Sequence, residues 1–142
     1  MRKKEQSNLV APSSRRFTLP KSHILRGRRN YQRLFTSSDL LKSHSVNLRY
    51  ACPDKGEGIQ VSFIAPKRTG TAVQRNRTKR LMREAYRLHQ FELTDTMSQL
   101  ENDVHFAFIA RKALNNFDSV ENEVVTLLGK LRTRLLSPSE HI

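Results

Sequence analysis

Hydrophobic and polar residues alternate in two short segments of the first half of the chain. Residues 46–50 and residues 59–65 both follow a period of two, which is typical of strands with one buried face. Pro66 ends the second segment, because proline has no backbone N–H for the ladder of a sheet. Residues 104–110 form the most continuous hydrophobic run, which predicts a central strand.

Three other segments show the period of a helix. Residues 28–36 place large hydrophobic side chains three and four positions apart, which predicts a short helix. Residues 74–89 contain no glycine or proline and separate an apolar arc from an arc of cations. An apolar stripe follows Asp118, which we predict as the N-cap of a C-terminal helix, with Glu121 completing a capping box. The order of these elements predicts a single α+β domain in which helices pack on a sheet.

The chain has 142 residues, which is enough for one domain with a core of its own. Residues 1–22 are basic, rich in serine and without periodicity, so we predict a flexible N-terminal tail. The folded domain is expected over residues 23–137. Residues 138–142 are expected to form a short C-terminal tail.

The charge of the chain is strongly positive and is concentrated in two blocks. Lysine and arginine total 26 against 13 acidic residues, which gives a net charge of +13. Residues 1–34 contribute a net +9 and residues 67–87 a net +7, whereas residues 88–142 carry a net −3. This excess predicts a polyanionic partner, with nucleic acid favoured over an anionic membrane surface.

Several classes of protein are disfavoured by the same sequence. The longest apolar run, residues 106–110, is far shorter than the roughly 20 residues of a membrane span. The first ten residues lack the apolar stretch of a secretory signal. The single cysteine, Cys52, excludes an internal disulfide, and the histidines show no metal-ligand spacing. We therefore expect a cytoplasmic protein that binds no metal or cofactor by itself.

The cations of the helix predicted over residues 74–89 are spaced for contact with phosphates. Arg75, Lys79, Arg83 and Arg87 form a row at intervals of four residues, with Arg80 beside it. Like charges at this spacing weaken an isolated helix by about a few tenths of a kcal/mol per pair. The phosphates of a partner would offset that repulsion.

The segment KRTGTAVQRNRTKRLMREAYR, which begins at Lys67, resembles the signature of the bacterial ribonuclease P protein subunit family. It supplies the basic pair, the Arg-Asn-Arg core at residues 75–77 and the cations that follow, all in register. Residues 25–35 and 106–112 resemble the family's first helix and late strand, and the resemblance covers about residues 25–136.

The chain departs from the family pattern at three positions outside the Arg-Asn-Arg core. Ser62 stands where glycine is usual, Pro66 where serine is usual, and Tyr31 where phenylalanine is commoner.

The resemblance implies a protein subunit of a ribonucleoprotein endoribonuclease. In that family the RNA is the catalyst, and the protein binds both this RNA and the 5′ leader of precursor tRNA, whose removal makes the mature tRNA 5′ end. The holoenzyme needs the catalytic RNA and Mg²⁺, and we expect the protein to be monomeric outside it.

The fold that the resemblance implies is a small α/β sandwich of about four strands, like domain 2 of ribosomal protein S5. The family has a left-handed βαβ crossover, whereas the general rule for such connections predicts a right-handed one.

The resemblance also implies the residues of two binding sites. The RNA-binding residues are Lys67, Arg68, Gly70, Arg75, Asn76, Arg77, Lys79, Arg80, Arg83 and Arg87. The residues of a cleft for the leader are Tyr31, Phe35, Val46, Leu48 and Tyr50.

We expect a positive φ at Gly70. Three other residues of these sites have alternative interpretations. Asn76 either reads a 2′-hydroxyl or caps the helix. Tyr31 and Phe35 either stack on unpaired bases or belong to the core.

No residue of the chain is predicted to be catalytic. A protein nuclease needs clustered carboxylates for metal ions or a histidine acid–base pair, and the basic blocks hold only Glu5 and Glu84. The main alternative is a ribosomal or ribosome-assembly RNA-binding protein, which shares the size and charge but not the Arg-Asn-Arg register. A DNA-binding module would need a helix and a short turn before residue 74, where we predict a strand and a glycine loop.

Overall fold

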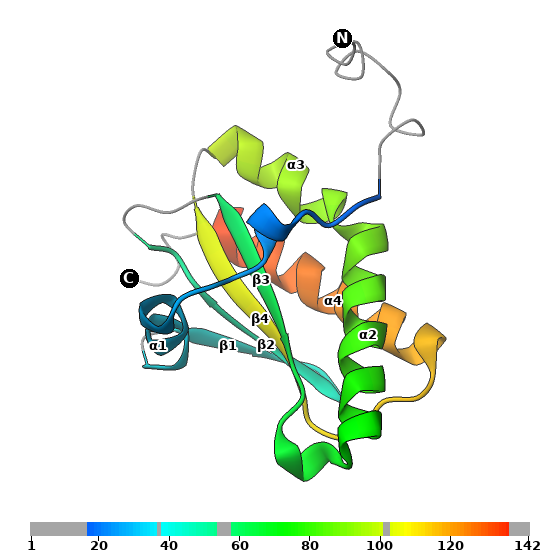
Figure 1. Ribbon diagram of the computed structural model, residues 1–142. Helices are drawn as coiled ribbons and strands as arrows, with labels where there is room; N and C mark the ends of the chain where they lie inside the picture. The colour runs from blue at the N-terminus through cyan, green and yellow to red at the C-terminus, as the bar shows by residue number, and fades with distance from the viewer. Residues whose placement is uncertain (1–16, 37, 54–57, 101–102, 137–142) are drawn as a thin grey trace, which may run out of the picture.

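The computed structural model describes residues 17–36, 38–53, 58–100 and 103–136. Its centre is a four-stranded sheet in the order β1-β2-β4-β3 (Figure 1). The strands are β1 (Asp39–Lys42), β2 (Val46–Ala51), β3 (Ile59–Ile64) and β4 (Val104–Ala110). β2 is antiparallel to both β1 and β4, whereas β3 is parallel to β4. The structure confirms the predicted α+β class.

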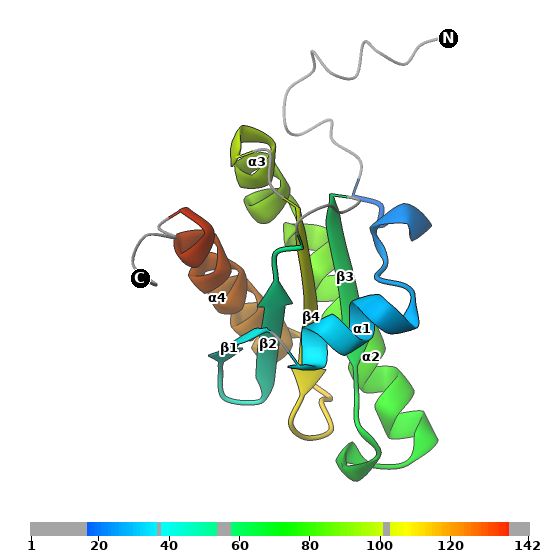
Figure 2. The ribbon, with the colours of Figure 1, turned by 90° about the vertical axis from the view of Figure 1, so that its left-hand side faces the viewer.

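Helices cover both faces of the sheet, but unequally. The helices are α1 (Arg28–Thr36), α2 (Ala72–His89), α3 (Phe91–Leu100) and α4 (Phe117–Leu136). Figure 2 shows α1 alone in front of the sheet, with α2 and α4 behind it. No helix in the described part of the chain combines the length and the apolar character that crossing a bilayer requires.

The main core lies between the sheet and the pair α2 and α4. Tyr86 of α2 is buried among Phe106 and Phe108 of β4, with ring centroids 5.6 and 5.9 Å away, and Phe63 of β3 closes the group at 6.1 Å. A smaller cluster under α1 consists of Leu25, Leu34, Ala51 and Ala107. Because neighbouring strand residues face opposite sides, β4 contributes to both clusters.

The connection from β3 through α2 to β4 is left-handed. In Figure 2, seen from the side of α1, both strands run downward, α2 lies behind the sheet, and β4 lies to the left of β3. The expectation drawn from the family resemblance is therefore confirmed, and the general rule for parallel crossovers does not hold here.

Both predictions about the start of the C-terminal helix are wrong. The backbone N–H of Ser119 donates to Oδ1 of Asn116 at 3.0 Å, so Asn116 rather than Asp118 caps α4. Glu121 completes no capping box there, because its carboxylate contacts Nε2 of His89 at 2.8 Å. Strand β1, which has only four residues, was not predicted from the hydrophobic pattern.

The N-terminal boundary of the domain also differs from the prediction. Phe17 packs edge-on against Phe91 with ring centroids 5.4 Å apart, and the side chain of Gln90 donates to the backbone oxygen of Thr18 at 2.7 Å. Leu19 is partly buried against the main core. Residues 17–22 therefore belong to the domain, while the rest of the predicted N-terminal tail and residues 138–142 lie outside the described residues.

Candidate nucleic-acid interface

The loop before α2 is shaped by one glycine and a capping box. Residues 67–69 form a single 3₁₀ turn, after which Gly70 has φ 144°. A Cβ at Gly70 would overlap the side chain of Gln74. Thr71 then caps α2, since its hydroxyl accepts from the Gln74 N–H at 3.2 Å and Gln74 Oε1 accepts from the Thr71 N–H at 2.8 Å. The positive φ predicted for Gly70 is confirmed.

Asn76 lies inside α2 and not at its start. Because Thr71 is the N-cap, the capping role considered for Asn76 is excluded. Its side chain is exposed on the helix surface. An amide there can both donate and accept hydrogen bonds, so Asn76 is available to a polar ligand.

One face of α2 is fixed in the core. Thr78, Met82, Ala85 and Tyr86 are all buried, and burial raises the pKa of Tyr86. The Thr78 hydroxyl accepts from the backbone N–H of Leu114 at 2.9 Å, which joins α2 to the loop between β4 and α4. The helical period over residues 74–89 places Thr78, Met82 and Ala85 on the apolar arc, whereas Tyr86 stands out in the sequence only as part of the signature segment.

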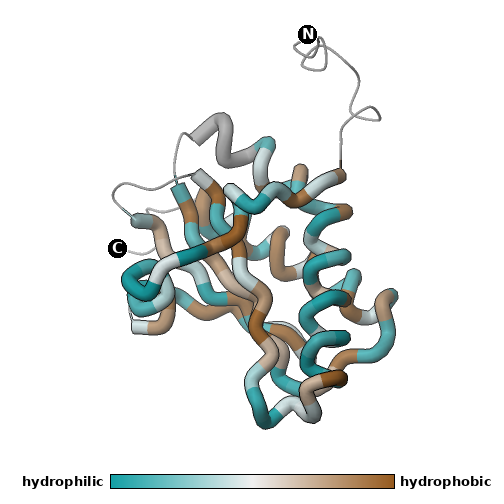
Figure 3. Tube along the Cα trace, in the orientation of Figure 1, coloured by the Kyte–Doolittle hydropathy of each residue, from teal (hydrophilic) through white to brown (hydrophobic). Residues whose placement is uncertain are grey.

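The opposite face of α2 and the preceding turn present the cations to solvent. Figure 3 shows hydrophilic residues along the length of α2. The exposed members of the predicted set are Lys67, Arg68, Arg77, Arg80 and Arg83, and the partly exposed members are Arg75, Lys79 and Arg87.

Contacts within the chain hold some of these cations in place. The Arg75 guanidinium donates to the backbone oxygen of Gly70 at 3.0 Å. The Arg83 guanidinium lies 5.6 Å from the ring centroid of Phe63, within the range of a cation–π contact. Both contacts leave the cations on the surface, so the helix carries a preformed positive row.

Arg87, at the end of that row, differs from the other cations. Its guanidinium forms an ion pair with Glu84 and donates to the backbone oxygen of Phe17. The hydrogen bond from Arg87 lowers the pKa of the Glu84 carboxyl, and the same bond raises the pKa of Arg87. A carboxylate of the same chain therefore balances the charge of Arg87.

The two aromatic residues of α1 have different surroundings. Their rings stack with centroids 6.4 Å apart and an interplanar angle of 15°. The Tyr31 hydroxyl lies 2.7 Å from the Ser62 hydroxyl and donates to the backbone oxygen of Leu25 at 3.3 Å. Phe35 is 47 % exposed. Of the two interpretations, Tyr31 takes part in packing, and Phe35 presents its ring to solvent.

The structure does not bring the three strand residues of the predicted cleft to these rings. Val46, Leu48 and Tyr50 are buried in the main core, on the side of α2 and α4. Their assignment to a cleft with Tyr31 and Phe35 is therefore wrong. The physical reason is that the apolar positions of β2 turn toward the larger core.

The intervening residues of β2 face the side of α1. Asn47 pairs with Ile109, and Arg49 pairs with Ala107, which belongs to the cluster under α1. Arg49 also donates to the Ser38 hydroxyl at 3.4 Å. These polar strand positions were missed, although the alternation along residues 46–50 contains the signal for them.

The described residues hold no group of three or more histidine, cysteine, aspartate or glutamate side chains suited to a metal ion.

The fold is a small α+β sandwich with a left-handed crossover. It presents a cationic helix on one side and aromatic and polar groups on the other. These features together define a nucleic-acid-binding class of protein. A family model described as Ribonuclease P matches residues 19–132. The chain belongs to this family, as the Arg-Asn-Arg signature predicted, and it is a ribonuclease P protein subunit that acts in tRNA processing.

Comparisons with individual proteins agree. The ribonuclease P protein component of Chlorobaculum tepidum is 34% identical over 113 residues, which cover 72% of this chain and 73% of that protein. The component from Dictyoglomus thermophilum is 36% identical over 118 residues, covering 81% and 89%. The solved RNase P protein of Staphylococcus aureus has a TM-score of 0.64 at 17% identity, covers 78% of this chain and 96% of its own, and supports the fold.

Proposed function

We propose that this chain is the non-catalytic subunit of ribonuclease P and binds both the catalytic RNA and the 5′ leader of precursor tRNA. The observation that carries the proposal is the exposed row of cations on α2. Glu84 is the single acid among residues 72–89, and it is paired with Arg87. The remaining cations of the helix are therefore available to phosphates.

The two sides of the molecule suit two different RNA partners. The α2 side offers planar arginine guanidinium groups and lysine ammonium groups to the phosphate backbone of a folded RNA. The α1 side offers the exposed ring of Phe35 together with the polar positions Asn47 and Arg49. Such a combination of a stacking platform and polar groups suits an unpaired strand, such as the leader.

The chemistry of cleavage is assigned to the RNA with its Mg²⁺ ions, as the family resemblance implies. The protein supplies positive charge where two polyanions meet, which reduces the Mg²⁺ needed to hold the substrate. We further propose that the chain is monomeric outside the ribonucleoprotein and works in the cytoplasm.

The test is cleavage of precursor tRNA by the RNA alone, the protein alone and both together, each at low and high Mg²⁺. We expect the RNA alone to cleave at high Mg²⁺, and the mixture to cleave at low Mg²⁺ as well. Cleavage by the purified protein alone would overturn the non-catalytic role. A protein that leaves the Mg²⁺ requirement of the RNA unchanged would overturn the proposed electrostatic role.

A further inference from the structure

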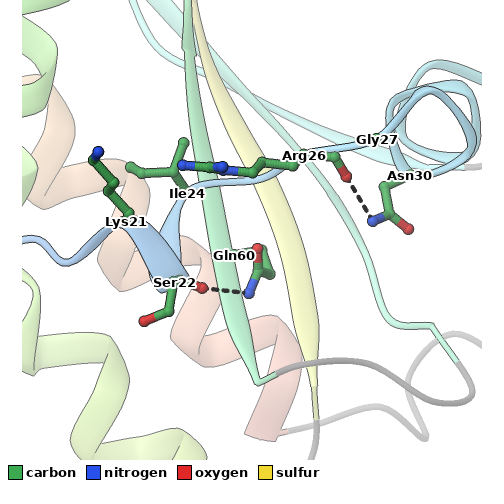
Figure 4. A pocket seen from close by; sticks show the side chains of 7 residues that line it. All are labelled: Lys21, Ser22, Ile24, Arg26, Gly27, Asn30 and Gln60. Carbon is green, nitrogen blue, oxygen red and sulfur yellow. Dashed lines mark hydrogen bonds between the residues drawn. The ribbon is translucent and has the colours of Figure 1, made fainter.

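A hollow of about 560 Å³ lies beside the outer edge of β3, next to the segment that precedes α1 (Figure 4). It is lined by Lys21, Ser22, Ile24, Arg26, Gly27, Asn30 and Gln60. Its size falls within the range of sites that hold small organic groups, such as a nucleotide. None of these seven residues belongs to the predicted RNA-binding set or to the predicted cleft.

The walls of the hollow are held by contacts to the backbone. The segment before α1 joins the edge of β3, since Ile24 bridges to Val61 and the Leu25 N–H donates to the Val61 oxygen at 2.9 Å. Gln60 donates to the backbone oxygen of Ser22 at 2.7 Å. At the other end, the Asn30 side chain donates to the backbone oxygen of Arg26 at 2.8 Å. The hollow is therefore part of the folded domain.

The lining has the chemistry of a site for an anion with polar edges. Lys21 and Arg26 are both exposed and come from opposite ends of the segment, while Gln60 reaches across from β3 (Figure 4). No carboxylate is among the lining residues. The described ion pairs of the chain involve Arg87 and His89, neither of which lies here. An arginine and a lysine around a hollow with amide and hydroxyl groups suit a phosphodiester and its base or ribose.

The hollow continues the α1 side of the sheet. Gln60 and Ser62 lie on the same face of β3, because residues two apart along a strand point the same way. Ser62 contacts the hydroxyl of Tyr31, whose ring stacks on Phe35. Two residues of a strand span roughly 7 Å, which is about the spacing between neighbouring nucleotides of an extended strand. A strand of RNA that stacks on Phe35 and runs past Tyr31 can therefore place a further nucleotide at the hollow.

We propose that this hollow binds one nucleotide of a single-stranded RNA segment, with its phosphate at Lys21 and Arg26 and its polar edges at Asn30. The inference rests on the proposed function and adds a site to it. The RNA segment comes either from the leader of precursor tRNA or from an unpaired part of the catalytic RNA, since both present the same chemistry.

The test compares two double variants of equal charge in the full-length protein. Lys21→Gln with Arg26→Gln removes both cations of the hollow. Lys130→Gln with Arg132→Gln removes two cations from α4, on the opposite face of the sheet. A third variant, Ser22→Phe, fills the hollow and leaves every charge in place. Thermal unfolding checks that all three variants remain folded.

Binding is measured in two arms. One arm titrates the reconstituted holoenzyme with precursor tRNAs whose leaders differ in length, and the other titrates the catalytic RNA with the protein alone. We expect Lys21→Gln with Arg26→Gln to weaken binding roughly tenfold in one arm. The slope of log K against log salt should fall by about 1.4 if both cations contact phosphates, because each such contact with a single strand contributes about 0.7. Ser22→Phe should weaken the same arm.

The two arms identify the source of the nucleotide. A deficit that appears only with longer leaders assigns the nucleotide to the leader, and a deficit in the second arm assigns it to the catalytic RNA. Equal losses in the two double variants, or unchanged binding with Ser22→Phe, overturn the proposed site. If the unaltered protein fails to bind or assist the RNA, the proposed function fails, and this outcome is distinct from failure of the site.

Discussion

The hydroxyl of Tyr31 lies 2.7 Å from the hydroxyl of Ser62, so a single side chain ties α1 to β3. The ring of the same tyrosine stacks on Phe35, which is 47 % exposed. The two aromatic residues, one helical turn apart, therefore have separable roles. Tyr31 contributes to the fold, whereas Phe35 is free to contact a ligand.

Substitutions at these two positions should affect different properties. Tyr31→Phe removes the contact with Ser62 and should lower the free energy of unfolding by about 1 kcal/mol. Phe35→Ala removes an exposed ring, so it should change stability by less than about 0.5 kcal/mol. It should weaken the binding of precursor tRNA by about 1–3 kcal/mol, the contribution of one stacked base. Urea unfolding and titration of the holoenzyme measure the two effects.

Phe35→Leu serves as the control, because it keeps an apolar side chain but removes the aromatic face. It should reproduce the loss of affinity. If Phe35→Ala instead destabilises the protein as much as Tyr31→Phe and leaves affinity unchanged, Phe35 is a packing residue and the stacking role is wrong.

Two glycines should respond to alanine in opposite directions. Gly70 has φ 144°, and a Cβ there would overlap Gln74, whose side chain completes the capping box of α2. Gly70→Ala should therefore destabilise the protein by more than about 1 kcal/mol. Gly129 lies inside α4 with no atom within 4 Å of an added Cβ. Gly129→Ala should stabilise the protein by about 0.5–1 kcal/mol, because alanine favours the helix.

Chemical unfolding in urea distinguishes the two outcomes, provided that the slope of free energy against denaturant stays the same. If Gly70→Ala leaves the free energy of unfolding unchanged, the turn over residues 67–69 adjusts to the new side chain. RNA binding by this variant then reports whether the turn must keep its shape, since Lys67 and Arg68 lie within it.

The hydroxyl of Thr78 should matter for stability and not for RNA binding. It is buried and accepts from the backbone N–H of Leu114. Thr78→Val keeps the shape of the side chain but leaves that N–H without its partner, which should cost about 1–3 kcal/mol. Thr78→Ser keeps the hydroxyl and should lose less. Equal unfolding free energies for the two variants would contradict the assigned role of the hydrogen bond.

The sequence predicts those structural features that depend on residues close together in the chain. The buried arc of α2 follows directly from the 3.6-residue period, and Thr78, Met82 and Ala85 lie where the period places them. Alternation along β2 separates its two faces but does not say which face meets α1. That choice depends on the relative size of the two cores, which is why the predicted cleft wrongly includes Val46 and Leu48.

Other features depend on contacts between distant parts of the chain. Residues 17–22 show no periodicity, and they are held by Phe91 and Gln90, far along the sequence. The left hand of the crossover contradicts the general preference for parallel strands and followed only from the family resemblance. The sequence pattern does not distinguish Arg80 from Arg87, since both are arginines of the cationic arc of α2. Glu84, however, lies three residues before Arg87, a spacing that brings these two side chains together on a helix.

The difference between Arg80 and Arg87 should appear in the salt dependence of RNA binding. Arg80 is exposed beside the cationic row and takes part in none of the described ion pairs, whereas Arg87, at the end of the row, is paired with Glu84. Arg80→Ala should reduce the slope of log K against log salt by about 1, because one phosphate contact is lost. Arg87→Ala should change the slope less. Filter binding to the catalytic RNA at several salt concentrations measures both slopes, and equal decreases would show that RNA displaces Glu84 from Arg87.

Neutralising Glu84 should strengthen RNA binding. The hydrogen bond from Arg87 lowers the pKa of the Glu84 carboxyl, so the ion pair is fully formed above the ordinary pKa of glutamate. The pair is lost as the pH falls through this lowered pKa, and its contribution to stability disappears with it. Because both side chains are partly exposed, that contribution is at most about 1 kcal/mol. Glu84→Gln should therefore change stability little at pH 7, while it releases the guanidinium of Arg87 for a phosphate.

The expected result for Glu84→Gln is an increase in the salt slope of up to about 0.9, the value for one additional phosphate contact. Asp118→Asn is the control of equal charge, because Asp118 is exposed in the first turn of α4 and takes part in none of the described ion pairs. An equal gain in both variants would mean that net charge alone sets the affinity. A gain confined to Glu84→Gln would show that this carboxylate limits the number of cations that α2 presents to RNA.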